Sequence, residues 1–223
     1  MSTIWFSSIG KKLVMSISGL FLIVFLLVHL IANLFYFGGE EAYNAMCHFM
    51  DTNPVVLIMV PVLALGFMVH IAWATVITLM NRLARPVKYK TQSAPSLSKW
   101  ESRNMYILGL IVLGALAWHL SHFWWNMQFQ HFIGAEAVSN PYSLLVQTFS
   151  NPCISALYMV WVVALWFHLN HGFWAALHSV GLNNQIWMKR WKFLAKIYSF
   201  VIAIGFISIP VVVLISNSCR FCK

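Results

Sequence analysis

The sequence predicts an all-α fold: an integral membrane bundle of five transmembrane helices forming a single domain over residues 1–223. The first reason is composition, because 61% of the 223 residues are hydrophobic and only 9% are charged. A soluble domain carries roughly 25% charged residues to keep its surface hydrated. The second reason is the presence of five apolar stretches, each long enough for a bilayer core that takes about 20 residues to cross. Together these observations exclude a soluble enzyme, a disordered chain and a nucleic-acid-binding module.

The predicted spans cover, in chain order, residues 13–37, 55–80, 104–130, 153–180 and 196–216. Pro54 and Pro152 stand immediately before spans two and four, where proline suits the first turn of a helix. The Gly38-Gly39 pair and Gly181 follow spans one and four and are typical of helix ends. Pro210 lies inside span five, where we expect it to kink the helix.

The placement of basic residues predicts the orientation. Twelve of the 14 basic residues lie before span one, between spans two and three, or between spans four and five: Lys11, Lys12, Arg82, Arg85, Lys88, Lys90, Lys99, Arg103, Lys189, Arg190, Lys192 and Lys196. The opposite side holds most of the acidic residues, namely Glu40, Glu41, Asp51 and Glu136. The positive-inside rule therefore puts the N-terminus in the cytoplasm. We expect a multi-pass protein of the cell's inner, cytoplasmic membrane, whose positive charge marks cytoplasmic loops rather than a nucleic-acid partner.

Seven of the nine histidines fall inside predicted spans: His29, His70, His119, His122, His168, His171 and His178. An ionisable side chain within a membrane is costly and indicates function by default. Counted from the cytoplasmic end at about 1.5 Å per residue, His29 and His119 lie about 22–24 Å deep, and His70 and His168 about 15–18 Å deep. Two pairs at two levels, each from two helices, are the geometry of bis-histidine haem ligation.

Small residues beside these histidines favour the same interpretation, because a porphyrin needs space; Ala164 and Gly172 flank His168 one turn away on each side. The alternative is that each histidine binds no cofactor and serves only as a hydrogen-bonding partner between neighbouring helices. His122 and His171 lie one turn from a stronger candidate, and helical spacing alone does not choose between them. We interpret both as contacts that orient a ligand or bind a haem propionate, with plain packing as the alternative. His178 is expected to make a polar contact near the cytoplasmic interface.

Other chemistries fit less well. A copper or zinc site would take its ligands from one level, and a proton-driven transporter would need carboxylates inside the spans. Cytochromes that hold both haems between the same two helices need two distant histidines on each, which spans one and two lack. The C-x-x-C of Cys219 and Cys222 lacks the following histidine of a haem c attachment site. We interpret these cysteines as free thiols or a tail disulfide.

Five segments of the chain, in this order, resemble one family: FLLVHLIANLF around His29, GGEEAYNAMCHFMD at 38–51, FMVHIAW around His70, AWHLSHFWW around His119 and FHLNHGFWAALHSVG from Phe167. The chain resembles the dihaem, five-helix cytochrome b anchor of succinate:quinone oxidoreductases. The resemblance implies that His70 and His168 hold a proximal haem b, nearer the cytoplasm. It implies that His29 and His119 hold a distal haem b.

The same resemblance implies two partners on the cytoplasmic face, a flavoprotein subunit that carries the succinate or fumarate site and an iron–sulfur subunit. It favours menaquinone as the membrane electron carrier, at an outer site near the distal haem. His48, Phe49 and Asp51 are the candidates for that site; an ordinary polar loop is the alternative. Trp166 stands where some fumarate reductases of the family carry a glutamate for proton transfer, so we do not expect that proton path.

The expected function is therefore electron transfer between the iron–sulfur subunit and quinone, in a succinate dehydrogenase or fumarate reductase. This subunit itself would carry no catalytic residue for succinate chemistry. Two alternatives are a dihaem cytochrome b of a hydrogenase or formate dehydrogenase, and a haem-free structural anchor. The identity of the co-purifying subunits separates the first of these, and an absorbance spectrum separates the second.

Overall fold

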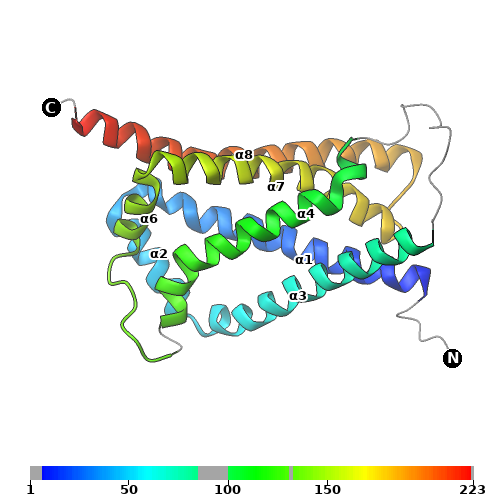
Figure 1. The fold of residues 1–223 in the computed structure, drawn as a ribbon, viewed down its shortest axis with the longest axis horizontal. Helices are drawn as coiled ribbons and strands as arrows, with labels where there is room; N and C mark the ends of the chain where they lie inside the picture. The colour runs from blue at the N-terminus through cyan, green and yellow to red at the C-terminus, as the bar shows by residue number, and fades with distance from the viewer. Residues whose placement is uncertain (1–6, 85–99, 131–132, 222–223) are drawn as a thin grey trace.

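The computed structural model describes residues 7–84, 100–130 and 133–221, and all regular structure within them is helical (Figure 1). The elements are α1 (Ser8–Leu34), the short 3-10 helix η2 (Phe35–Gly38), α2 (Glu40–Thr52), α3 (Pro54–Leu83), α4 (Trp100–His119), the π-helix η3 (Leu120–Phe129), α6 (Pro141–Ser150), α7 (Pro152–Ser179) and α8 (Gln185–Phe221). The predicted all-α fold class is confirmed.

Five helical stretches in the described part of the chain are long and apolar enough to cross a membrane. They are Ile9–Gly38, Pro54–Leu83, Arg103–Phe129, Pro152–Ser179 and Gln185–Ser218. Each contains nearly all of one predicted span, so the five predicted apolar stretches are confirmed as helices long enough to cross a membrane. The largest difference is at α8, which begins at Gln185, well before the predicted start at residue 196. The basic residues from Lys189 to Lys196 therefore lie on the first turns of this helix and not in a loop.

The ends of the long helices follow the local sequence. Pro54 and Pro152 occupy the first turn of α3 and α7, as predicted. The preceding residue caps each helix, since Asn151 accepts hydrogen bonds from two backbone N–H groups and its counterpart before α3 accepts one. Gly39 and Gly181 have φ of +90° and +93°, a left-handed conformation that favours glycine. Pro210 lies within α8 without ending it.

The helices α2 and α6 were not predicted, and they lie together at one end of the bundle (Figure 1). The described start of the chain is at the opposite end, because one long helix precedes α2 and three precede α6. A buried cluster joins the α2–α6 end to α7 and α8; it includes Tyr43, Leu145, Phe149, Tyr158 and Val213. A second cluster, of Ile23, Leu30, Leu169 and Ile202, holds α1, α7 and α8 together at mid-bundle. Helix α3 contributes no buried residue, so it lies on the outside of the bundle, where its apolar side chains would face lipid.

Candidate functional site

The first pair of histidines joins α1 to the end of α4. The ring centroids of His29 and His119 lie 5.7 Å apart, with the ring planes at 82°. Phe25 stacks on His29 at 5.4 Å, and Phe206 of α8 lies 5.6 Å from the same ring. Phe123 contacts His119 at 5.4 Å. These aromatic rings surround the pair with apolar surface that excludes water.

The second pair joins α3 to α7. The ring centroids of His70 and His168 lie 6.3 Å apart, with the planes at 71°. A glycine of another helix lies beside each ring: a Cβ added to Gly19 would be 3.5 Å from Cε1 of His70, and one added to Gly109 would be 3.6 Å from Cε1 of His168. The close approach of α1 and α4 therefore shapes the space around this pair.

The residues of both pairs fit a haem. Two imidazoles bound to opposite sides of one iron would have ring centroids about 6 Å apart, from a metal–nitrogen distance of about 2.0 Å. The buried Nδ1 of His168 has no hydrogen-bond partner among the described residues. No group of three or more His, Cys, Asp or Glu in the described part of the chain converges as a metal site. Two protein ligands suit a haem, whose porphyrin supplies the remaining four, and are too few for structural zinc.

His122 belongs to a different contact from His119. Its Nδ1 lies 3.1 Å from the hydroxyl of Tyr158, and the two rings stack with centroids 6.1 Å apart. The Trp118 ring lies 5.1 Å from the same imidazole, with the planes at 75°. Helical spacing leaves open whether His119 or His122 pairs with a histidine of another helix. In the structure it is His119 that faces His29, whereas His122 contacts Tyr158. No sequence spacing identifies Tyr158, because it lies on another helix.

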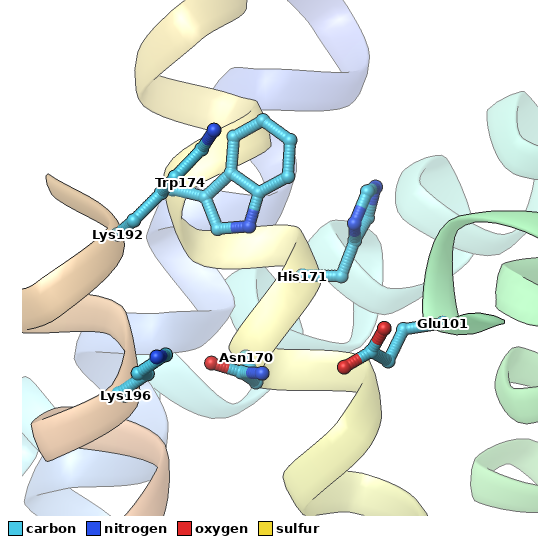
Figure 2. Close-up of a pocket in the computed structure, with 6 residues that line it drawn as sticks. All are labelled: Glu101, Asn170, His171, Trp174, Lys192 and Lys196. Atoms are coloured by element: carbon cyan, nitrogen blue, oxygen red, sulfur yellow. The ribbon is translucent and has the colours of Figure 1, made fainter. Parts of the chain in front are cut away.

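His171 lines a pocket outside the two pairs, together with charged side chains (Figure 2). The other lining residues are Glu101 of α4, Asn170 and Trp174 of α7, and Lys192 and Lys196 of α8. The ring of His171 meets that of Trp174 at 4.8 Å, and the Lys192 Nζ lies 4.8 Å from the Trp174 ring. His171 therefore lies in a mixed-charge pocket, whereas His168 faces His70.

The other two predicted contact residues on α7, Gly172 and His178, have more open surroundings. A Cβ added to Gly172 would meet no atom within 4 Å, which leaves open space beside α7. His178 is exposed at the end of α7, and its Nε2 lies 3.2 Å from the Asn183 amide. It makes the expected polar contact near the helix end.

The three candidates for the quinone site, all on α2, differ in their exposure. His48 and Phe49 are exposed, whereas Asp51 is half-buried and accepts a hydrogen bond of 3.4 Å from Gln128 of η3. Burial raises the pKa of the nearby Cys47 thiol to about 12, and the Asp51 carboxylate contributes to this rise. Burial and the neighbouring Cys47 also raise the pKa of Tyr43. Asp51 therefore connects α2 to η3 through its hydrogen bond with Gln128. The sequence alone does not reveal Gln128 as its partner.

Among known proteins, the chain is similar to a cytochrome subunit of succinate dehydrogenase. The chain is 25% identical over 161 residues to the succinate dehydrogenase cytochrome b558 subunit of Bacillus subtilis (strain 168), covering 72% of this chain and 73% of that protein. No protein-family profile and no solved structure matches the chain. The relative supports the resemblance to the membrane anchors of succinate:quinone oxidoreductases, and with the five apolar helices it supports a multi-pass membrane protein.

Proposed function

We propose that this protein is the dihaem cytochrome b anchor of a succinate dehydrogenase or fumarate reductase and carries electrons between an iron–sulfur subunit and membrane quinone. The proposal rests on two pairs of facing imidazoles. The ring centroids lie 5.7 Å apart in one pair and 6.3 Å apart in the other. Each pair is drawn from two different helices, as cofactor sites in helix bundles commonly are. The similarity to a cytochrome b subunit of succinate dehydrogenase supports the same function.

In this proposal His29 and His119 hold the distal haem b, and His70 and His168 hold the proximal one. A haem b with two axial histidines supplies one-electron transfer and leaves no coordination position open for oxygen. The histidines of the chain would hold the haems through their ring nitrogens, and the residues around them would keep water out. Phe25 and Phe206 pack around the distal pair, and Gly19 and Gly109 allow neighbouring helices to approach the proximal pair.

The partner subunits in this proposal dock on the basic, cytoplasmic end of the bundle. Lys189, Arg190 and Lys192 are exposed on the first turns of α8, and Arg82 is exposed at the end of α3. Further basic residues between spans two and three, Arg85, Lys88, Lys90 and Lys99, would also belong to this docking surface, and they lie outside the described residues. The flavoprotein would carry out succinate or fumarate chemistry, and the iron–sulfur subunit would exchange electrons with the proximal site. This orientation puts the N-terminus in the cytoplasm and the protein in the cytoplasmic membrane.

Menaquinone is the proposed substrate, at the outer end near the distal pair. A quinone takes up two protons for every two electrons, and no carboxylate lies inside the predicted apolar spans to deliver them. Asp51 and His48 on α2 are groups that can exchange protons with outer water. The contact between Asp51 and Gln128 ties this carboxylate to η3, which directly follows His119.

Purification of the intact complex from its native membrane tests the proposal. A pyridine haemochrome assay should give two haems b per chain, with a low-spin spectrum, and a flavoprotein and an iron–sulfur protein should co-purify. One haem per chain, or a high-spin spectrum, would count against the paired ligands. A nickel or molybdenum subunit in the complex would instead assign the chain to a hydrogenase or formate dehydrogenase. A preparation with no haem absorbance would leave only the structural anchor.

A further inference from the structure

One turn of α1 lies directly against the ring of His70. The Ser18 Oγ lies 3.4 Å from Nδ1 of His70. A Cβ added to the next residue, Gly19, would be 3.5 Å from Cε1 and 3.8 Å from Nδ1 of the same ring. Both observations place the Nδ1–Cε1 edge of the imidazole against α1. This leaves Nε2 as the ring nitrogen with no described contact to α1.

The hydrogen bonds of Ser18 determine whether its hydroxyl donates a proton to His70 or accepts one from it. Its hydroxyl also lies 3.1 Å from the carbonyl oxygen of Met15, which can only accept. A serine hydroxyl has one proton to donate and two lone pairs with which to accept. Once that proton is donated to Met15, Ser18 can interact favourably with His70 only by accepting from a protonated Nδ1. Ser18 is 7% exposed, so water does not readily replace either bond.

The partner histidine lacks such a contact. The buried Nδ1 of His168 has no hydrogen-bond partner among the described residues, although Gly109 lies beside its ring at 3.6 Å from Cε1. The two imidazoles of the proximal pair are therefore unequal. One has an acceptor for its outer N–H, and the other has none.

We propose that Ser18 is a positioning residue that accepts the Nδ1–H of His70 and so holds the tautomer whose Nε2 lone pair faces the proximal haem iron. The inference rests on the proposed function, in which His70 is an axial ligand. An acceptor on the outer nitrogen of a ligating histidine fixes its orientation and raises its basicity as a ligand. A more basic ligand favours ferric over ferrous iron and lowers the midpoint potential. Ser18 therefore keeps the potential of the proximal haem below the value it would have without this contact.

Ser18→Ala in the purified complex tests this inference through redox titration of the two haems by visible and electron paramagnetic resonance spectroscopy. The expected result is an upward shift of the proximal midpoint potential, with no shift of the distal one. Ser18→Thr retains the hydroxyl and should keep the wild-type potential. The matched control is Ser199→Ala, since Ser199 is fully buried on α8 and its hydroxyl donates a hydrogen bond to the Lys196 carbonyl at 3.2 Å. That variant should leave both potentials unchanged.

The outcomes separate this inference from the proposed function. If the wild type holds two haems and Ser18→Ala leaves the proximal potential unchanged, the role of Ser18 is wrong and the haem assignment stands. If His70→Ala retains both haems, the ligand assignment is wrong, and the inference falls with it. Loss of the proximal haem in Ser18→Ala, with retention in Ser18→Thr, supports positioning by the hydroxyl. If Ser18→Ala does not assemble, Ser18→Cys supplies a weaker acceptor and should also shift the proximal potential upward; an unchanged potential there overturns the inference.

Discussion

The Nδ1 atom of His122 lies 3.1 Å from the Tyr158 hydroxyl, while the ring of His119, one α-helical turn earlier, lies 5.7 Å from that of His29. The helix changes from α to π at Leu120, between the two histidines. A π-helix has a wider turn than an α-helix, so side chains after this point depart from α-helical spacing. The change of helix type accompanies a difference between the two imidazoles: His119 faces His29, whereas His122 lies within hydrogen-bond distance of Tyr158, whose ring also lies 6.4 Å from that of His119.

His119→Ala should therefore lower the haem content from two to one per chain by removing the distal haem, because His29 would lose its facing ligand. His122→Ala should retain both haems, because this substitution removes contacts with Tyr158 and Trp118 and leaves His29 facing His119. The pyridine haemochrome assay measures both results. If His122→Ala loses a haem while His119→Ala keeps both, the ligand in this helix has been misassigned.

His70→Ala should remove the proximal haem and spare the distal one, since the distal pair lies on other helices. His171→Ala is the matched control; it changes a histidine one turn from His168 that lines the pocket of Figure 2. This control should keep both haems. Electron paramagnetic resonance of the oxidised proteins distinguishes the two low-spin signals, and loss of the same signal in both variants would contradict the prediction.

Asp51→Asn and His48→Ala should each slow quinone-linked turnover by about tenfold or more, which is within the usual contribution of a proton-transfer group. Both variants should keep two haems and normal electron transfer from the flavoprotein to an artificial acceptor, which bypasses the membrane. Glu41→Gln is the control, because Glu41 is an exposed acid on the same helix. Normal quinone activity in both variants would refute the outer site. So would a quinone inhibitor bound beside the cytoplasmic loops.

Cys47 should resist alkylation over the range from pH 7 to 10. Burial raises its thiol pKa to about 12, and the thiolate is the reactive form, so labelling should accelerate only as the pH approaches that value. Asp51→Asn removes a negative charge that contributes to the raised pKa and should increase the labelling rate. Iodoacetamide labelling with peptide mass mapping gives the rate at each site, with the exposed Cys153 as the reference. Equal labelling of the two cysteines at pH 8 would contradict the burial of Cys47.

Gly205→Ala should destabilise the bundle by about 1–3 kcal/mol, as overpacking of a well-filled core does. The added Cβ would lie 2.6 Å from Cδ1 of Leu30, which is 2% exposed and therefore has no free space to move into. Gly114→Ala is the control, since its added Cβ would meet no atom within 4 Å. Thermal unfolding of the purified variants compares them. An unchanged melting temperature for Gly205→Ala would show that α1 and α8 can separate without cost.

The five spans were predictable because a bilayer imposes a length and a composition that can be read without knowing any contact. The approach of His29 to His119 and of His70 to His168 was also predictable from depth, since helical rise converts position along the chain into height. Their role as haem ligands stays a prediction. The rotation of each helix about its own axis was not predictable, because the spans are apolar on all sides and carry little facial pattern.

For this reason the contacts of Ser18 with His70 and of Tyr158 with His122 come only from the structure. The helices α2 and α6 were missed for another reason. They are short and lie between the predicted spans, where apolar length gives no signal. The contact between Gln128 and Asp51 depends on their packing and is equally absent from the local sequence.

The two histidine pairs interleave along the chain, because His70 of one pair lies between His29 and His119 of the other. Synthesis proceeds from the N-terminus, so the earlier helices are made while the later ones do not yet exist. The pair of His29 and His119 is complete as soon as α4 has been made. The pair of His70 and His168 is complete only when α7 has been made. A nascent chain that ends after η3 thus has one complete histidine pair and one histidine without its facing partner. The order of the helices sets an order of maturation, in which the pair of His29 and His119 forms first and the pair of His70 and His168 forms last.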